Sequence, residues 1–135
     1  MDQKYATFEY PAEGVLKVSF SATEPTEKQF EAYLHEYEKI LRSSAGYVVV
    51  IDGSKARYLP SKLRARQGKW QQEQEALIIE KVLKLFFVIT NPLVKYILQG
   101  IFLVSKPPVT YSVLVSQAQA VEEATEVAKA LAPQE

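Results

Sequence analysis

Apolar runs of strand length alternate with helix-length segments through most of this 135-residue chain. Residues 47–51 (YVVVI) form a continuous run rich in β-branched side chains, which is typical of a strand buried on both faces of a sheet. Residues 83–90 (LKLFFVIT) and 109–115 (VTYSVLV) are further strand candidates. Strands separated by whole helices pair in parallel through right-handed crossovers. The alternation therefore predicts an α/β fold with a mostly parallel central sheet and covering helices.

Two short strands open the chain, at residues 5–10 (YATFEY) and 15–20 (VLKVSF). The turn residues PAEG between them predict a hairpin. Capping residues indicate where the helices begin. The expected helices are one that follows the Thr26–Gln29 capping box, one from about Ser61 to Lys81, one that opens at Asn91-Pro92 and one capped by Ser116. The predicted order is ββαβαβαβα, in a single domain spanning residues 1–135.

The composition limits the kinds of partner. Sixteen basic and sixteen acidic side chains cancel, so we expect no nucleic-acid partner. The absence of cysteine excludes disulfides, thiolate catalysis and cysteine-ligated metal. The first ten residues lack the apolar core of a signal peptide, which predicts a cytoplasmic protein.

Residues 83–104 are mostly apolar and could be mistaken for a membrane span. However, Asn91-Pro92 interrupts the segment, and Lys84 and Lys95 fall within it. Each half is shorter than the roughly 20 apolar residues that one spanning helix needs. We therefore expect a buried strand followed by a buried helix, and no membrane span.

No catalytic set can be assembled from the sequence. His35 is the single histidine, and it lies on the polar side of the first expected helix. The chain has no Walker loop, no GxGxxG motif and no metal-ligand spacing. We expect a protein that is not an enzyme, without catalytic residues, metal or cofactor.

Asp52 ends the buried run at residues 47–51 and is followed by Gly53 and Ser54. The carboxyl end of a central strand is the usual place for function in an open α/β sheet. The alternative is that Asp52 caps the turn after the strand, since aspartate hydrogen-bonds its own backbone two residues on.

Basic residues crowd the expected start of the second helix, where Lys62, Arg64 and Arg66 follow Ser61. Cations are unfavourable in a first helical turn, by roughly 0.3–1 kcal/mol each. An anion arriving there would meet both the guanidinium groups and free backbone N–H groups, and a phosphate on Ser61 would serve equally. We predict an anion or partner surface formed by these residues with Ser54; the alternative is a solvated basic face.

The helix expected after Pro92 carries more apolar residues than one buried stripe requires. Leu98 and Phe102 fall away from some of the others around the helix, so part of this surface must meet something besides the sheet. That could be a neighbouring subunit, a lipid-like ligand or a deeper core. A homodimer is the simplest of these, because its two-fold symmetry lets one apolar patch pack against the same patch of a second copy.

The element order, together with Asp52-Gly53-Ser54 and a serine seven residues after Ser54, resembles the STAS domain family, whose best-known members are bacterial anti-sigma-factor antagonists. More particularly, the chain resembles divergent bacterial STAS-like proteins, which also resemble the CRAL-TRIO lipid-binding fold. The resemblance implies a STAS-like fold and a protein partner, and it places Ser61 on the position that a partner kinase phosphorylates. Residues 60–64 (PSKLR) differ from the family pattern, in which an aspartate precedes the serine and small residues follow it.

These observations predict a non-enzymatic protein-interaction or regulatory module. It would respond to an anion or to phosphorylation at the start of the second helix. The alternative is a carrier of a hydrophobic, lipid-like ligand.

Overall fold

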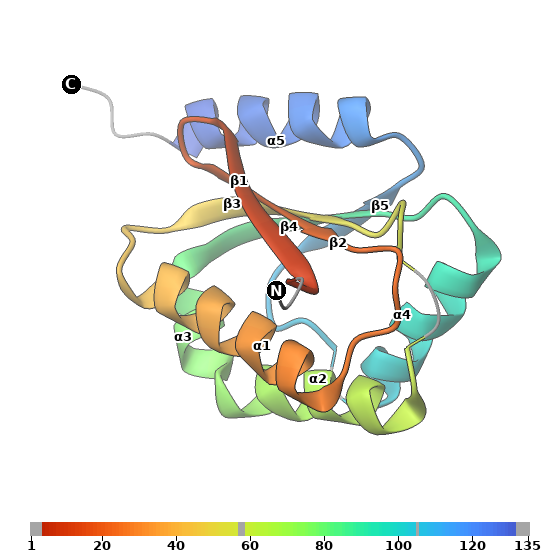
Figure 1. Ribbon diagram of the computed structural model, residues 1–135. Helices are drawn as coiled ribbons and strands as arrows, with labels where there is room; N and C mark the ends of the chain where they lie inside the picture. Colours follow the sequence, from red (N-terminus) through yellow and green to blue (C-terminus); the bar gives the residue numbers. More distant parts are fainter. Residues whose placement is uncertain (1–3, 57–58, 105, 132–135) are drawn as a thin grey trace.

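The computed structural model describes residues 4–56, 59–104 and 106–131, which form one five-stranded sheet with helices on both faces (Figure 1). The elements in chain order are β1 (Ala6–Ala12), β2 (Val15–Phe20), α1 (Glu27–Arg42), β3 (Tyr47–Asp52), α2 (Ser61–Glu73), α3 (Glu75–Lys81), β4 (Val82–Val88), α4 (Pro92–Val104), β5 (Tyr111–Leu114) and α5 (Gln117–Leu131). The predicted α/β class is confirmed.

The strands lie in the sheet in the same order as in the chain, β1-β2-β3-β4-β5. The hairpin pair β1–β2 is antiparallel, and the three other pairs are parallel. The register sets Val18 beside Ile51, and Ile51 beside Phe87. The predicted opening hairpin and mostly parallel sheet are therefore confirmed.

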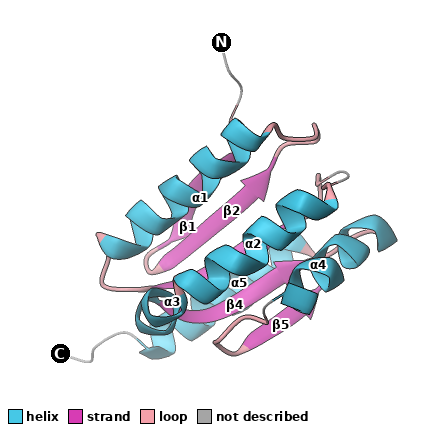
Figure 2. Ribbon diagram, turned by 90° about the horizontal axis from the view of Figure 1, so that it is seen from below, coloured by secondary structure: helices cyan, strands magenta, loops and turns pink. Residues whose placement is uncertain are grey.

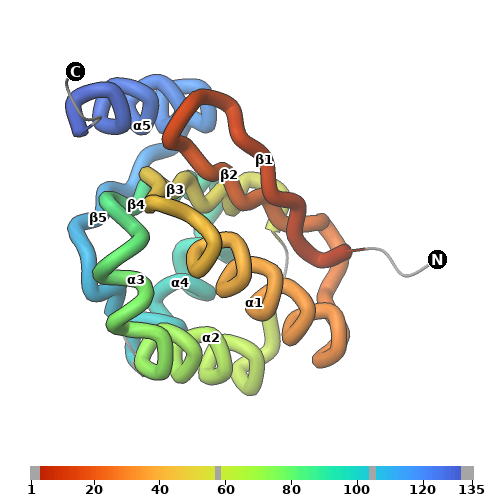
Figure 3. Tube along the Cα trace, turned by 90° about the vertical axis from the view of Figure 1, so that its left-hand side faces the viewer, coloured from red at the N-terminus to blue at the C-terminus, as the bar shows by residue number. Residues whose placement is uncertain are grey.

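Helices α1 to α4 cover one face of the sheet and α5 covers the other (Figure 1, Figure 3). Successive side chains of a strand point to opposite faces. Val49 accordingly packs under α1 to α4, whereas Val48 and Val50 pack against Ala120 and Ala124 of α5. Strand β3 is thus covered on both sides, as its uninterrupted apolar run predicts.

Side-chain caps begin three of the helices. Thr26 and Gln29 form the predicted capping box of α1. The Asn91 Oδ1 atom accepts a hydrogen bond from the Val94 N–H at the start of α4, at 2.9 Å. The Ser116 Oγ atom accepts one from the Gln119 N–H at the start of α5, at 3.2 Å. Each cap satisfies an N–H group that the helix itself leaves without a partner.

The helix predicted from Ser61 to Lys81 is divided at Gln74, which separates α2 from α3. The Gln74 backbone leaves helical geometry, with φ −103° and ψ 19°. Its side-chain oxygen accepts a hydrogen bond from Arg42 at the end of α1. Neither proline nor glycine marks this position, so the sequence pattern gave no sign of the division.

Within the described part of the chain, no helix is long and apolar enough to cross a membrane. Residues 83–104 instead divide into most of β4 and all of α4, as predicted.

Candidate functional site

Asp52 is buried at the end of β3, with 5% of its surface exposed. Its Oδ1 atom accepts a hydrogen bond from the Ser54 N–H at 2.9 Å. Its Oδ2 atom lies 3.9 Å from Nζ of Lys17 on β2. The first contact is the one that an aspartate makes when it caps the turn after a strand, and the second places a cation beside the buried carboxylate.

Helix α2 begins at Ser61, and the residue before it, Pro60, has no side chain that can cap the helix. The Ser61 side chain is exposed. The N–H groups of Leu63 and Arg64 both donate to the Pro60 carbonyl oxygen at 3.0 Å. The structure thus leaves the Ser61 hydroxyl on the surface of the first helical turn.

Lys62 and Arg66 face α1, which lies beside α2 (Figure 2). Lys62 pairs with Glu27, and Arg66 pairs with Glu31 of α1 and with Glu73 of its own helix. The hydrogen bonds to Glu27 and to Glu31 raise the pKa of Lys62 and of Arg66, respectively. Both side chains therefore already have carboxylate partners.

Arg64 points away from α1, toward α4. Its guanidinium carbon lies 5.0 Å from the centre of the Tyr96 ring. A Cβ atom added to Gly100 would lie 3.0 Å from the Arg64 Cδ atom, so glycine permits this close approach. A surface hollow runs between the two helices, and its lining includes Ser61, Arg64, Tyr96, Gln99, Gly100 and Leu103. We call it the α2–α4 hollow.

The structure therefore brings Ser61 and Arg64 together and turns Lys62 and Arg66 to the other side of α2. Ser54 lies outside the α2–α4 hollow, and its carbonyl oxygen is 3.5 Å from the Thr90 hydroxyl. Arg57, a further base in the loop before α2, lies outside the described residues.

Leu98 and Phe102, the predicted hydrophobic interface, are half-buried against the main core. The Phe102 ring contacts Phe87 and Tyr111, with ring centres 5.8 Å and 5.5 Å apart. Leu98 lines a cavity beneath the helices. Both side chains thus keep only part of their surface exposed, and the most exposed apolar side chain of α4 among those described is Leu103, at 89%.

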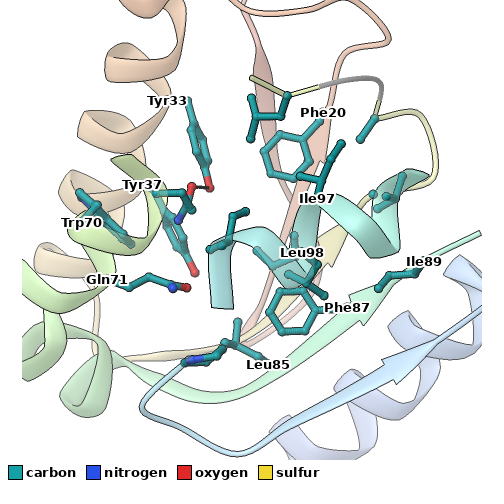
Figure 4. Close-up of a pocket in the computed structure, with 18 of the residues that line it drawn as sticks. Phe20, Tyr33, Tyr37, Trp70, Gln71, Leu85, Phe87, Ile89, Ile97 and Leu98 are labelled. Carbon is teal, nitrogen blue, oxygen red and sulfur yellow. Dashed lines mark hydrogen bonds between the residues drawn. The ribbon is translucent and has the colours of Figure 1, made fainter. Parts of the chain in front are cut away.

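The cavity has a volume of about 100 Å³ and lies between the sheet and helices α1, α2 and α4 (Figure 4). Its walls include Tyr33 and Tyr37 of α1, Trp70 of α2 and Phe87 of β4. The Tyr33 hydroxyl donates to Gln67 Oε1 at 3.0 Å, and burial raises the pKa of Tyr33 well above its ordinary value.

The sequence pattern does not predict this cavity. A signal was present, since the buried stripe of α2 carries Gln67, Trp70 and Gln71 where a stripe packed only for stability would be aliphatic. That pattern indicates a face with polar and aromatic groups, but it does not reveal unfilled space.

Among the described residues, no group of three His, Cys, Asp or Glu side chains could hold a metal ion. His35 is exposed on α1.

No protein family matches the chain in a comparison of sequence profiles, and no curated protein matches it in sequence. Its structure is similar to that of the anti-sigma factor antagonist SpoIIAA in its unphosphorylated form, with a TM-score of 0.59. The similarity covers 87% of this chain and 94% of SpoIIAA, at 12% sequence identity. The chain therefore has the STAS-like fold that its sequence predicted.

Proposed function

We propose that this protein is a non-enzymatic regulatory module that binds a protein partner at the α2–α4 hollow. The observation that carries this proposal is the composition of the hollow. Arg64 and Tyr96 lie against each other there, beside the exposed Leu103. Arginine and tyrosine dominate binding hot spots in protein interfaces, and a large exposed apolar side chain next to them adds buried area on binding.

The fold supports the same reading. SpoIIAA, which shares it, is an antagonist of an anti-sigma factor and therefore acts through another protein. At 12% identity the likeness is one of fold, so the chemistry of the α2–α4 hollow defines the proposed partner.

Modification of Ser61 is our proposal for how binding is regulated. The hydroxyl is exposed in the first turn of α2, and Arg64 is three residues further along the same hollow. A phosphate at this position would be favoured by the helix dipole and by the guanidinium group. It would also add about two negative charges to the proposed interface, and so change its affinity for a partner.

The wild type and the variants Arg64→Glu, Leu103→Glu and Ser61→Asp are each expressed in the native host and cross-linked to bound proteins there. Each is then purified, and the proteins recovered with it are compared. Lys69→Glu is the control, because Lys69 is an exposed base on α2 outside the hollow. The proposal expects a partner that is enriched with the wild type and with Lys69→Glu, and lost with Arg64→Glu and Leu103→Glu. Affinities should then be measured with the purified partner. A partner retained equally by all variants would place the interface elsewhere.

We also propose a homodimer that forms through α4. Leu98 and Phe102 are partly buried against the core, so self-association would rest mainly on the exposed Leu103 and Tyr96. Sedimentation equilibrium at micromolar concentration should then show a dimer that Leu103→Glu dissociates. A dimer that survives Leu103→Glu, or a monomeric wild type, would contradict this location.

A further inference from the structure

The cavity beneath α1, α2 and α4 is larger than the voids that protein interiors usually leave. Cores are close-packed, and voids larger than a water molecule are few. One water molecule occupies about 30 Å³ of liquid, whereas this cavity has about 100 Å³. The space is sufficient for a small organic molecule.

The walls favour an apolar and uncharged occupant. The described residues that line the cavity include no charged side chain, and most are aromatic or aliphatic. Tyr33 and Gln67 share a hydrogen bond in the wall, and Tyr37 and Gln71 are further polar side chains that line it (Figure 4). This lining suits an occupant that is mainly apolar and carries a polar atom for the wall.

Trp70 adds one specific polar feature. It lines the cavity, is 3% exposed and stacks on Tyr37, with ring centres 5.2 Å apart. Its Nε1–H group is buried and has no hydrogen-bond partner among the described residues. An unpaired buried donor is unfavourable, so an acceptor placed beside it adds to the affinity of a ligand.

We propose that this cavity binds a compact, uncharged ring compound that carries one hydrogen-bond acceptor for the Trp70 indole. A cavity of about 150 Å³ accepts benzene, so a single ring is the largest compound that this smaller cavity can take, and its entry requires the walls to move slightly apart. An acyl chain of membrane-lipid length exceeds it. This inference rests on the cavity alone and is independent of the partner proposed for the α2–α4 hollow.

The test uses toluene, phenol and 1-hexanol, which are matched in their number of non-hydrogen atoms. Trp70 is the single tryptophan in the chain, so one indole N–H signal in a ¹⁵N-labelled sample reports on the cavity wall. We expect phenol to shift this signal and to bind at least as tightly as toluene. Phenol is more favourably hydrated than toluene, so this result requires a hydrogen bond in the cavity. The flexible 1-hexanol should bind more weakly than either ring compound.

Two substitutions on α4 separate binding in the cavity from binding at the surface. Leu98→Phe enlarges a side chain that lines the cavity, and Leu103→Phe makes the same change at an exposed position outside it. We expect Leu98→Phe to weaken phenol binding by about tenfold, which corresponds to about 1.4 kcal/mol. Leu103→Phe should leave it unchanged, and thermal unfolding of both variants checks that they fold.

A Trp70→Phe variant tests the acceptor. It removes the N–H group and keeps an aromatic ring, so the preference should change from phenol to toluene, measured by ligand-induced shifts of the unfolding temperature. The proposal is overturned if no probe binds, if 1-hexanol binds most tightly, or if Leu98→Phe has no effect. Tighter binding of toluene than phenol by the wild type would overturn the role of Trp70.

Discussion

At the scale of single residues, Asp52 shows how one side chain can hold a turn and a neighbouring strand together. Its two carboxylate oxygens are directed to different groups, the Ser54 N–H and the Lys17 ammonium. Both contacts lie where β2 and β3 end side by side, because the parallel register pairs Ser19 with Asp52. The residue is therefore a structural support for the loop that leads to α2.

We expect Asp52→Ala to lower the free energy of unfolding by about 1–3 kcal/mol. The substitution leaves the Ser54 N–H without its acceptor and leaves the largely buried Lys17 without its carboxylate. Urea unfolding of Asp52→Ala, Asp52→Asn and Lys17→Met measures the two contributions. Asp52→Asn keeps an acceptor for Ser54 and should be the milder change. An Asp52→Ala variant as stable as the wild type would show that neither contact matters.

At the scale of elements, the sequence predicted contacts between residues close together in the chain. It did not predict contacts between residues that only the packing of helices brings together. The caps formed by Thr26, Asn91 and Ser116 involve residues three positions apart, so the sequence contains all the information they need. In contrast, Lys62 and Arg66 find Glu27 and Glu31 only because α1 packs beside α2. The sequence therefore predicted a cluster of bases without predicting that part of it is neutralised.

The cavity was unpredictable for a related reason. It exists because the side chains of α1, α2, α4 and the sheet do not quite fill the space between them. Hydrophobic periodicity predicts which face of an element is buried, but it does not give the packing density of that face. The same limit applies to Leu98 and Phe102, because periodicity does not show how much of their apolar surface the core covers.

Phosphate titration tests the start of α2. We expect backbone amide signals of residues 61–64 to shift, because Ser61 and Arg64 share the α2–α4 hollow and Arg64 has no carboxylate partner among the described residues. Arg64→Glu should abolish the response and Lys69→Glu should not. The double variant Glu27→Gln, Glu31→Gln should enlarge it, since Lys62 loses its ion pair and Arg66 keeps only Glu73. A uniform drift across all signals would contradict a site.

Gly53 fixes the contact between the end of β3 and the start of α4. A Cβ atom at this position would lie 2.8 Å from Val94 Cγ1 and 3.0 Å from the Val88 carbonyl oxygen. We therefore expect Gly53→Ala to destabilise the protein by about 1–3 kcal/mol, measured by urea unfolding. Gly100→Ala is the control, because its Cβ would meet only the flexible Arg64 side chain. Equal stability of the two variants would contradict the close contact.

At the scale of the whole molecule, buried tyrosines set the behaviour at high pH. Burial raises the pKa of Tyr5, Tyr33 and Tyr37 above the ordinary value. Each one stays protonated in the folded protein at a pH where the unfolded chain has lost the proton. Their contribution to stability is therefore complete below about pH 10 and is lost as the pH rises further.

We expect the free energy of unfolding to fall above about pH 10 by up to about 1.4 kcal/mol per pH unit for each buried tyrosine. Urea unfolding between about pH 8 and pH 11 measures this slope, and Tyr37→Phe should reduce it. Absorbance of tyrosinate should rise for these residues only as the protein unfolds. A stability that does not change above about pH 10 would contradict the buried, neutral state of these side chains.

The order of the strands has a consequence for synthesis on the ribosome. Because β1 to β5 lie in the sheet in the order in which they are translated, each new strand can pair with one that has already emerged. No strand has to be inserted between two others. On the opposite face of the sheet, α5 covers Val48, Val50 and Phe86, and α5 follows all five strands in the chain. Until that helix leaves the exit tunnel, the nascent chain exposes an apolar strip that a chaperone can recognise.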